Sequence, residues 1–115
     1  MMDVDKFKSF NDHYGHLHGD TVLKMIAQTL AKNLRKTDIL ARFGGDEFAA
    51  ILTDTDLNGA VASSRKIQAA VSSMVFMECR LGISIGSANF QAGMTPEQFI
   101  EVADQDLYRI KNPNP

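Results

Sequence analysis

Two short apolar runs separated by four residues constrain the fold of this chain most strongly. Ile39 to Phe43 and Phe48 to Leu52 each have the length of a β-strand, and Gly44-Gly45-Asp46-Glu47 lies between them. Short apolar runs joined by a glycine-containing connection are typical of a β-hairpin. We therefore expect a hairpin whose turn requires positive φ angles, with two carboxylates at its tip.

Helical periodicity precedes the hairpin. Phe7, Phe10 and Tyr14 predict a first helix that Gly15 ends. A long amphipathic helix is then expected to begin at Asp20 and to fade at residues 35–37. Its inward face comprises Leu23, Ile26, Ala27, Leu30 and Leu34.

Further elements follow the hairpin. A third helix is expected to carry Ala60, Ser64, Ile67 and Val71, and the alternation of Leu81, Ile83 and Ile85 with small residues predicts a strand. Thr95-Pro96-Glu97-Gln98 provides a capping hydroxyl, a proline at the first helical position and a capping box, which indicates a last helix. The expected inward face of that helix comprises Phe99, Val102, Ala103, Leu107 and Ile110.

The order of these elements predicts the fold class. Met1 to Val4 resembles the end of a buried strand, which gives the order strand, two helices, hairpin, helix, strand, helix (β-α-α-β-β-α-β-α). This order favours an α+β domain with a mostly antiparallel central sheet and helices packed on it. With 115 residues, the chain has room for one domain, residues 1–115.

Composition excludes several classes of partner. The net charge of −2 gives no overall attraction to DNA, RNA or an anionic bilayer, although it leaves a single nucleotide open. No apolar stretch approaches the ~20 residues of a membrane helix, so no membrane insertion by this chain is expected. Because Cys79 is the single cysteine, no intrachain disulfide can form and a cytoplasmic setting is favoured.

Four carboxylates are expected at one end of the sheet. If the first strand lies beside the hairpin, Asp3 and Asp5 come close to Asp46 and Glu47. Such crowding is costly unless protons or a cation neutralise it, and oxygen ligands favour Mg²⁺, Mn²⁺ or Ca²⁺ over zinc. Mg²⁺ with a triphosphate fits best, and Asp3 and Asp46 are the natural bridging ligands for nucleotidyl transfer. The alternative is that these acids cap strand ends and face water.

An ordered set of motifs spans the first half of the chain. The motifs are Asp3-Val4-Asp5-Lys6-Phe7-Lys8, Asn11-Asp12, Gly15-His16, Gly19-Asp20 and Arg42-Phe43-Gly44-Gly45-Asp46-Glu47-Phe48. This set resembles the GGDEF family of diguanylate cyclases. Residues 82–86 and 103–111 are similar to the family's late strand and last helix, so the resemblance covers essentially the whole chain. It implies a ferredoxin-like, palm-type nucleotidyl cyclase fold that condenses two GTP molecules into cyclic di-GMP and pyrophosphate.

The resemblance assigns roles to the acidic residues. It implies that Asp3, Asp46 and the backbone carbonyl of Val4 hold Mg²⁺, with Mn²⁺ as a substitute. Asp46 is also the implied base for the ribose 3′-hydroxyl, and Glu47 is expected to support the metal or the substrate. Lys8 matches the lysine that balances the charge of the phosphates.

The remaining substrate contacts are implied in the same way. Asn11 and Asp20 match the pair that binds guanine; alone, they would be read as a solvated polar residue and a helix N-cap. Backbone amides around Lys6 and Phe7 are expected to cradle the phosphates, while the Phe7 ring lies in the core. Gly44 and Gly45 leave room for the nucleotide, and Lys111 joins the substrate-binding set.

Two further groups of side chains have competing interpretations. Arg35-x-x-Asp38 stands where many family members have an inhibitory site for cyclic di-GMP, and the alternative is an exposed salt bridge. His13, His16 and His18 raise the alternative of a zinc or nickel site, but their spacing matches no familiar motif. His16 belongs to the Gly-His-x-x-Gly-Asp part of the family pattern.

The resemblance also bears on assembly. It implies a homodimer, in which each 3′-hydroxyl attacks the partner's α-phosphate, and a sensory or dimerising module that can tether the domain to the inner membrane. We expect the chain to be incomplete, because it begins inside the first strand and Asn112-Pro113-Asn114-Pro115 replaces the family's basic Gly-Arg-Asn ending. The alternatives are a non-catalytic module that binds GTP or cyclic di-GMP, and a purely structural or dimerising domain.

Overall fold

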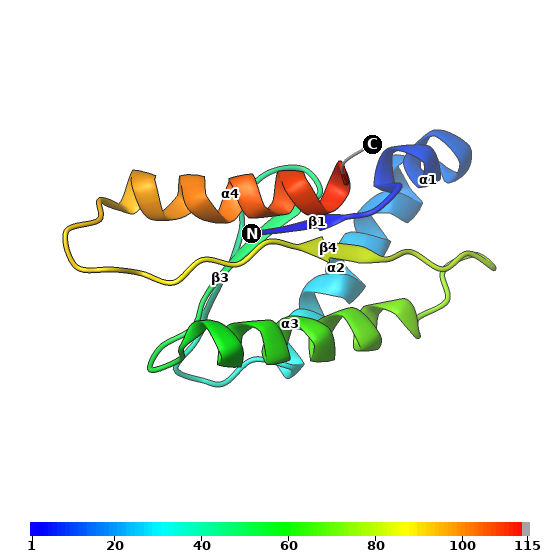
Figure 1. The fold of residues 1–115 in the computed structure, drawn as a ribbon. Helices are drawn as coiled ribbons and strands as arrows, with labels where there is room; N and C mark the ends of the chain where they lie inside the picture. Colours follow the sequence, from blue (N-terminus) through cyan, green and yellow to red (C-terminus); the bar gives the residue numbers. More distant parts are fainter. Residues whose placement is uncertain (114–115) are drawn as a thin grey trace.

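The computed structural model describes residues 1–113 and contains the predicted elements in the predicted order (Figure 1). Asn114 and Pro115, which belong to the expected non-basic ending, lie outside the described residues. The elements are β1 (Met2–Val4), α1 (Phe7–Tyr14), α2 (His16–Lys32), β2 (Ile39–Arg42), β3 (Glu47–Ile51), α3 (Leu57–Ser72), β4 (Ile83–Ile85) and α4 (Pro96–Lys111). The expected β-α-α-β-β-α-β-α order is confirmed.

The strands form one antiparallel sheet in the order β2-β3-β1-β4. Strand β1 therefore lies between the hairpin and the late strand, as the acidic-cluster hypothesis requires. Asp3 lies opposite Glu47 on β3 and opposite Ser84 on β4. The predicted α+β class with a mostly antiparallel sheet is confirmed.

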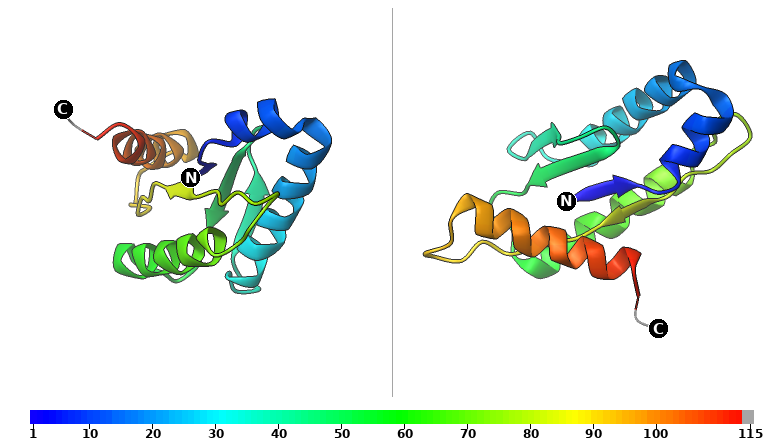
Figure 2. Two further views of the ribbon diagram at one scale, coloured as in Figure 1. Left: turned by 90° about the vertical axis from the view of Figure 1, so that its right-hand side faces the viewer. Right: turned by 90° about the horizontal axis from the view of Figure 1, so that it is seen from above.

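The two faces of the sheet are covered differently. Met2 and Val4 point to one face, where they pack with side chains of α1, α2 and α3. Asp3, between them in β1, points to the opposite face, on which α4 lies. Figure 2 shows α4 separated from the other three helices by the strands. The alternation of apolar and acidic residues in β1 thus places the core on one side and the charges on the other.

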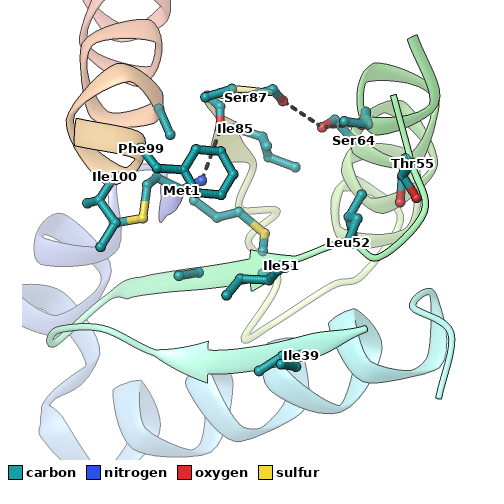
Figure 3. Close-up of a pocket in the computed structure, with 18 of the residues that line it drawn as sticks. Met1, Ile39, Ile51, Leu52, Thr55, Ser64, Ile85, Ser87, Phe99 and Ile100 are labelled. Atoms are coloured by element: carbon teal, nitrogen blue, oxygen red, sulfur yellow. Dashed lines mark hydrogen bonds between the residues drawn. The ribbon is translucent and has the colours of Figure 1, made fainter. Parts of the chain in front are cut away.

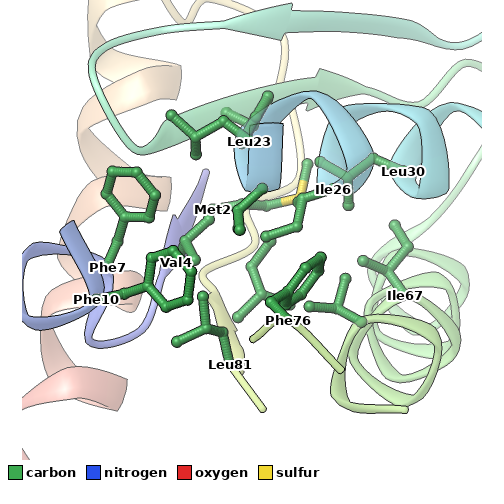
Figure 4. Close-up of a cluster of buried hydrophobic side chains, with 14 of the residues drawn as sticks. Met2, Val4, Phe7, Phe10, Leu23, Ile26, Leu30, Ile67, Phe76 and Leu81 are labelled. Carbon is green, nitrogen blue, oxygen red and sulfur yellow. The ribbon is translucent and has the colours of Figure 1, made fainter. Parts of the chain in front are cut away.

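The core lies between the sheet and helices α1 to α3 (Figure 4). Ile26 and Leu30 of α2 are completely buried, and Val71 of α3 meets the same cluster. Phe7 and Phe10 close it from α1. Burial of each such side chain contributes about 1.5–3 kcal/mol, so this face supplies most of the stability.

The connection between β2 and β3 differs from the prediction. Neither Gly44 nor Gly45 has a positive φ angle, so the expected turn type is wrong. The strands pair up to Arg42 and Phe48, and the Phe43 amide still donates to the Glu47 carbonyl at 2.9 Å. Four-residue connections of this kind are most often built around a type I turn, which needs no left-handed residue.

Helix α2 begins earlier than predicted. Its N-cap is Gly15, with φ 90°, and its first residue is His16 rather than Asp20. Because glycine adopts this φ without steric cost, α1 can end and α2 can start at one residue. Asp20 therefore lies inside α2, and the alternative of a helix N-cap for Asp20 is wrong.

Helix α4 has the predicted start but a narrower buried face. The Thr95 hydroxyl and the Gln98 side chain form the expected capping box. Ala103 and Leu107 are buried, whereas Val102 and Ile110, expected to face inward, are exposed. Within residues 1–113, α4 packs on the sheet without a neighbouring helix on that face. Only one stripe of its side chains is therefore buried.

The helices have the character of packed, amphipathic elements. α2, with 17 residues, buries Val22, Leu23, Ile26 and Leu30 on one side. Within residues 1–113, no helix combines the length and the apolar character needed to cross a bilayer.

Candidate metal and nucleotide site

Asp3 and Asp46 lie next to each other at one end of the sheet. The Val4 amide donates to the Asp46 carbonyl at 3.1 Å, which joins β1 to the hairpin loop. Burial raises the pKa of Asp46, and the neighbouring Asp3 raises it further. Two partly buried carboxylates in contact repel each other when both are ionised, so this position favours a bound cation.

The surroundings of Asp3 also fit a cation. Its side chain is 15% exposed, and its Oδ2 accepts a hydrogen bond from Lys111. Its Oδ1 is buried and has no hydrogen-bond partner among the described residues. A buried carboxylate oxygen without a partner is costly, and a divalent ion is one ligand that would satisfy it.

The other two carboxylates do not join this pair. Asp5 accepts a 2.6 Å hydrogen bond from the Ser84 hydroxyl, and Glu47 lines a cavity of about 400 Å³ together with Asp3 and Lys111. In residues 1–113, no three His, Cys, Asp or Glu side chains are arranged to hold a metal ion. The expected convergence of four carboxylates is therefore not found there, and the hypothesis narrows to Asp3, Asp46 and the Val4 carbonyl.

Arg42 organises the loop that carries Asp46. Its Nε donates to the Gly44 and Gly45 carbonyls, each at 3.2 Å, and its Nη2 donates to the Gly45 carbonyl at 2.6 Å. Sequence reasoning missed this role, although Arg42 stands directly before the glycine motif. A Cβ atom on Gly45 would meet nothing within 4 Å, so the chain itself leaves the space beside this residue open.

The start of α1 provides free backbone donors. Its N-cap, Lys6, has φ 57°, and no side chain caps the first turn. Unpaired N–H groups at a helix N-terminus attract anions such as phosphate. Lys8 is exposed on this turn, whereas the Phe7 ring is buried in the core as predicted.

Asn11 occupies a defined position between α1 and α2. Its Nδ2 lies 2.8 Å from His16 Nδ1, to which it donates when that ring nitrogen is unprotonated. Its Oδ1 is buried without a partner in the described chain and sits against Gly19, where a Cβ atom would lie only 2.0 Å away. His16 and Gly19 thus hold Asn11, a role that sequence analysis missed although both residues belong to the family motif. Asp20 is exposed on the following turn of α2.

The histidines are used separately. His16 contacts Asn11, while His13 packs edge-on against Tyr14 with ring centroids 4.5 Å apart. The alternative of a zinc or nickel site therefore has no support in the described part of the chain.

Arg35 and Asp38 form an ion pair with an Nη2–Oδ1 distance of 3.2 Å. Arg35 also donates to the Thr53 carbonyl and to the Thr55 hydroxyl. Burial acts to raise the pKa of Asp38, but hydrogen bonds from Arg35 and Thr53 outweigh it and lower the pKa. The pair is not fully exposed as the salt-bridge alternative assumed, because the Asp38 side chain is only 3% exposed. It ties the segment before β2 to the end of β3.

A larger cavity of about 540 Å³ lies between the β2–β3 hairpin and helices α3 and α4 (Figure 3). Its lining is mainly apolar and includes Ile39, Ile51, Phe99 and Ile100. Such a lining does not suit a triphosphate, so the acidic end of the sheet remains the candidate nucleotide site.

Proteins of similar sequence include a diguanylate cyclase and a response regulator. The chain is 40% identical over 115 residues to the diguanylate cyclase DgcP of Pseudomonas aeruginosa, and 39% identical over 118 residues to the response regulator PleD of Caulobacter vibrioides. Both alignments cover 96% of this chain. The chain spans only 17% of the length of DgcP and 26% of PleD.

Solved structures have the same fold. The diguanylate cyclase SiaD of Pseudomonas aeruginosa, in complex with its activator SiaC, superimposes with a TM-score of 0.91 at 32% identity, covering 96% of this chain and 44% of that one. The GGDEF domain of DgcB from Caulobacter crescentus, in complex with cyclic di-GMP, gives 0.91 at 30% identity, covering 96% and 68%.

The family model for the GGDEF domain of diguanylate cyclases matches residues 1–114. The whole described fold is therefore included in the match, together with the Gly44-Gly45-Asp46-Glu47-Phe48 motif. This chain belongs to the GGDEF domain family.

Proposed function

We propose that this chain is the catalytic domain of a diguanylate cyclase, which condenses two GTP molecules into cyclic di-GMP and releases two pyrophosphates. The observation that carries the proposal is the adjacency of Asp3 and Asp46 beside the uncapped first turn of α1. This arrangement combines a cation site with donors for phosphate. The named relatives and the cyclic di-GMP complex of DgcB support the same reaction.

The acidic pair has two tasks in this proposal. Asp3, Asp46 and the Val4 carbonyl would hold Mg²⁺ or Mn²⁺, which when bound would neutralise the triphosphate and favour departure of pyrophosphate. Asp46 accepts the proton of the ribose 3′-hydroxyl as the general base. Glu47, directly after it, supports the metal or the substrate.

Other residues hold the nucleotide. The first-turn amides of α1 near Phe7, together with Lys8 and Lys111, bind phosphate oxygens. Asn11 and Asp20 bind the guanine edge, because a carboxylate accepts from the N1 and N2 donors that adenine lacks. The space left beside Gly44 and Gly45 admits the ribose and phosphates.

The reaction requires two copies of the domain. Each copy binds one GTP, and its 3′-oxygen attacks the α-phosphorus of the partner's GTP while the bond to pyrophosphate breaks. We place this homodimer in the cytoplasm, under the control of a sensory or dimerising module in the same polypeptide.

The test incubates the purified chain with GTP and Mg²⁺ and measures cyclic di-GMP by liquid chromatography and mass spectrometry. A version fused to a parallel leucine zipper is tested alongside, because a monomer cannot complete the reaction. We expect product from the dimeric form and a loss of at least about 100-fold in Asp46→Asn. The matched control is Asp104→Asn, which removes an exposed carboxylate that lines the cavity of about 400 Å³ beside Asp3 and Glu47.

Two results would contradict the proposal. GTP binding without product in the forced dimer would favour a non-catalytic binding module. Absence of any magnesium-dependent GTP binding would favour a structural or dimerising domain.

We further propose that Arg35 and Asp38 bind cyclic di-GMP as a feedback site. Arg35 is 55% exposed and offers a guanidinium fork suited to phosphate and guanine oxygens. Calorimetric titration should detect cyclic di-GMP binding that Arg35→Ala abolishes and that Lys36→Ala, at the adjacent exposed residue, retains. Equal binding by both variants would contradict the assignment.

A further inference from the structure

The ion pair between Lys111 and Asp3 joins the two ends of the described chain. Within residues 1–113 two other ion pairs occur, and each links residues three positions apart: Arg35 with Asp38, and Arg109 with Asp106. Lys111 lies in the last turn of α4, on the sheet face to which Asp3 points. Its ammonium group therefore occupies one oxygen of a carboxylate that we assign to the metal.

The charges around Lys111 explain its position. The hydrogen bond to Asp3 raises the pKa of Lys111, and the carboxylates of Asp3, Asp5 and Asp46 add to this effect. The ammonium group is thus bound to Asp3 of β1 and is further stabilised by the negative charges of Asp46 in the hairpin loop and of Asp5, which follows β1. It provides the positive charge that Asp3 and Asp46 require when they lie together.

We propose that Lys111 is a built-in counter-cation of the Asp3–Asp46 pair, and that a divalent ion must displace it from Asp3 in order to bind. This inference rests on the proposed metal role of Asp3 and Asp46. The divalent ion would take the unpartnered Oδ1 of Asp3, while Lys111 holds Oδ2 of the same carboxylate. An ammonium group and a divalent cation on the same carboxylate repel each other.

The consequence concerns the order of binding. Without nucleotide, metal binding leaves the Lys111 ammonium group without the Asp3 carboxylate as its partner, so the affinity for the metal is low. With a triphosphate present, the ammonium group can move to a phosphate oxygen, which leaves Asp3 free of the repelling positive charge. Lys111 thereby couples metal binding to nucleotide binding.

The test measures Mn²⁺ affinity in the absence of nucleotide, by the electron paramagnetic resonance signal of free Mn²⁺ at fixed ionic strength. Lys111→Met retains most of the aliphatic stem and removes the charge. We expect it to bind Mn²⁺ about three- to fivefold more tightly than the unmodified chain, the upper part of the scale of one partly exposed ion pair. Arg109→Met removes one positive charge from the same helix end and should change the affinity by less than about twofold.

A second arm adds 3′-deoxy-GTP, which lacks the attacking hydroxyl. Here the advantage of Lys111→Met should fall below about twofold, because the unmodified lysine now has a phosphate partner. If Lys111→Met binds Mn²⁺ as much more tightly with 3′-deoxy-GTP as without it, Lys111 does not couple metal binding to nucleotide binding. Equal Mn²⁺ affinities of Lys111→Met and Arg109→Met without nucleotide would show that the metal does not displace Lys111.

A measurement on the unmodified chain protects the test against misfolding of the variant. In a Mg²⁺ titration followed by ¹³C NMR, the Lys111 ε-carbon signal should move to the position of a free lysine. A signal that stays at its initial position at saturating Mg²⁺ would overturn the proposal.

If neither Asp3→Asn nor Asp46→Asn weakens Mn²⁺ binding, the metal site itself is refuted. If both weaken it while Lys111→Met has no effect, only the counter-cation role fails.

Discussion

Asp46 stands at a position where the fold opposes its negative charge. Its carboxylate is partly buried and next to Asp3, and both effects raise its pKa. Residues placed for chemistry often reduce stability in this way, and Lys111 offsets only part of the effect on Asp46. Stability and function should therefore respond in opposite directions to a change at this residue.

Asp46→Asn should stabilise the metal-free protein by roughly 0.5–1 kcal/mol, because the amide has the same shape and no charge to repel Asp3. Urea unfolding in the presence of EDTA measures the difference. Asp104→Asn, at an exposed residue, should leave the free energy of unfolding unchanged. A destabilised Asp46→Asn protein would show that the carboxylate contributes to the fold itself.

Gly19 has a similarly specific role beside Asn11. A Cβ atom at this residue would lie 2.0 Å from Asn11 Oδ1, which is the mobile end of a side chain, and 3.1 Å from the Phe7 ring. The side chain of Asn11 can move away, so the contact restricts the position of the amide rather than the backbone.

Gly19→Ala should therefore weaken GTP binding by about tenfold or more, through displacement of Asn11. Its stability should stay within about 1 kcal/mol of the unmodified chain, because alanine favours the helix by a similar amount. Calorimetry with GTP and Mg²⁺ measures the first effect, and Asn11→Ala should reproduce it. Thr21→Ala, on the exposed side of α2, serves as the control. Unchanged GTP affinity in Gly19→Ala would separate Asn11 from guanine recognition.

At the scale of elements, α4 depends on one close approach to the sheet. Gly86, directly after β4, is so near the helix that a Cβ atom would lie 2.3 Å from the Leu107 amide nitrogen and 2.5 Å from the Ala103 carbonyl oxygen. Backbone atoms of a helix cannot move individually. The position of α4, and with it that of Lys111, thus depends on a glycine at residue 86.

Gly86→Ala should destabilise the domain by about 2–4 kcal/mol, since α4 has to shift away from β4. Gly45→Ala is the matched control, because a Cβ atom there meets nothing within 4 Å and the φ angle of Gly45 is not positive. Its free energy of unfolding should stay within about 0.5 kcal/mol of the unmodified chain. Equal stabilities of the two variants in urea would contradict the close packing of α4.

At the scale of the whole molecule, Asp38 couples global stability to pH. Hydrogen bonds from Arg35 and Thr53 lower its pKa in the folded state despite its burial. The folded state therefore favours the ionised carboxylate. This contribution is fully present above the ordinary pKa of about 3.9 and is lost as the pH falls through the lowered value.

Asp38→Asn should accordingly be less stable than the unmodified chain at pH 7, and the difference should shrink towards pH 3. Urea unfolding at several pH values measures it. Asp12→Asn, at an exposed residue of α1, should show no such trend. A difference that stays constant with pH would indicate that the variant acts through packing.

The whole molecule also separates an apolar cavity from the acidic end of the sheet. The cavity of about 540 Å³ lies over the outer face of the hairpin, where Ile39 and Ile51 are more than half exposed. Sequence patterns placed both residues in short apolar strand runs, and such runs do not tell which face of a strand another element covers.

The amino-acid sequence alone determined what local rules control. The element order, the Thr95 capping box and the buried positions of Phe7 and Phe10 follow from periodicity, capping chemistry and apolar character within a few neighbouring residues. The ordered motifs between Asp3 and Phe48 were sufficient to predict the family, because their residue types and spacing are so specific.

Tertiary structure alone decided the remaining features, because they depend on atoms that are far apart in the chain. Val102 stays exposed because, within residues 1–113, no second helix covers that side of α4. The pairing of Lys111 with Asp3 joins residues separated by 108 positions, which no periodicity or spacing specifies. Only the packing of α4 across β1 brings that ammonium group to the acidic pair.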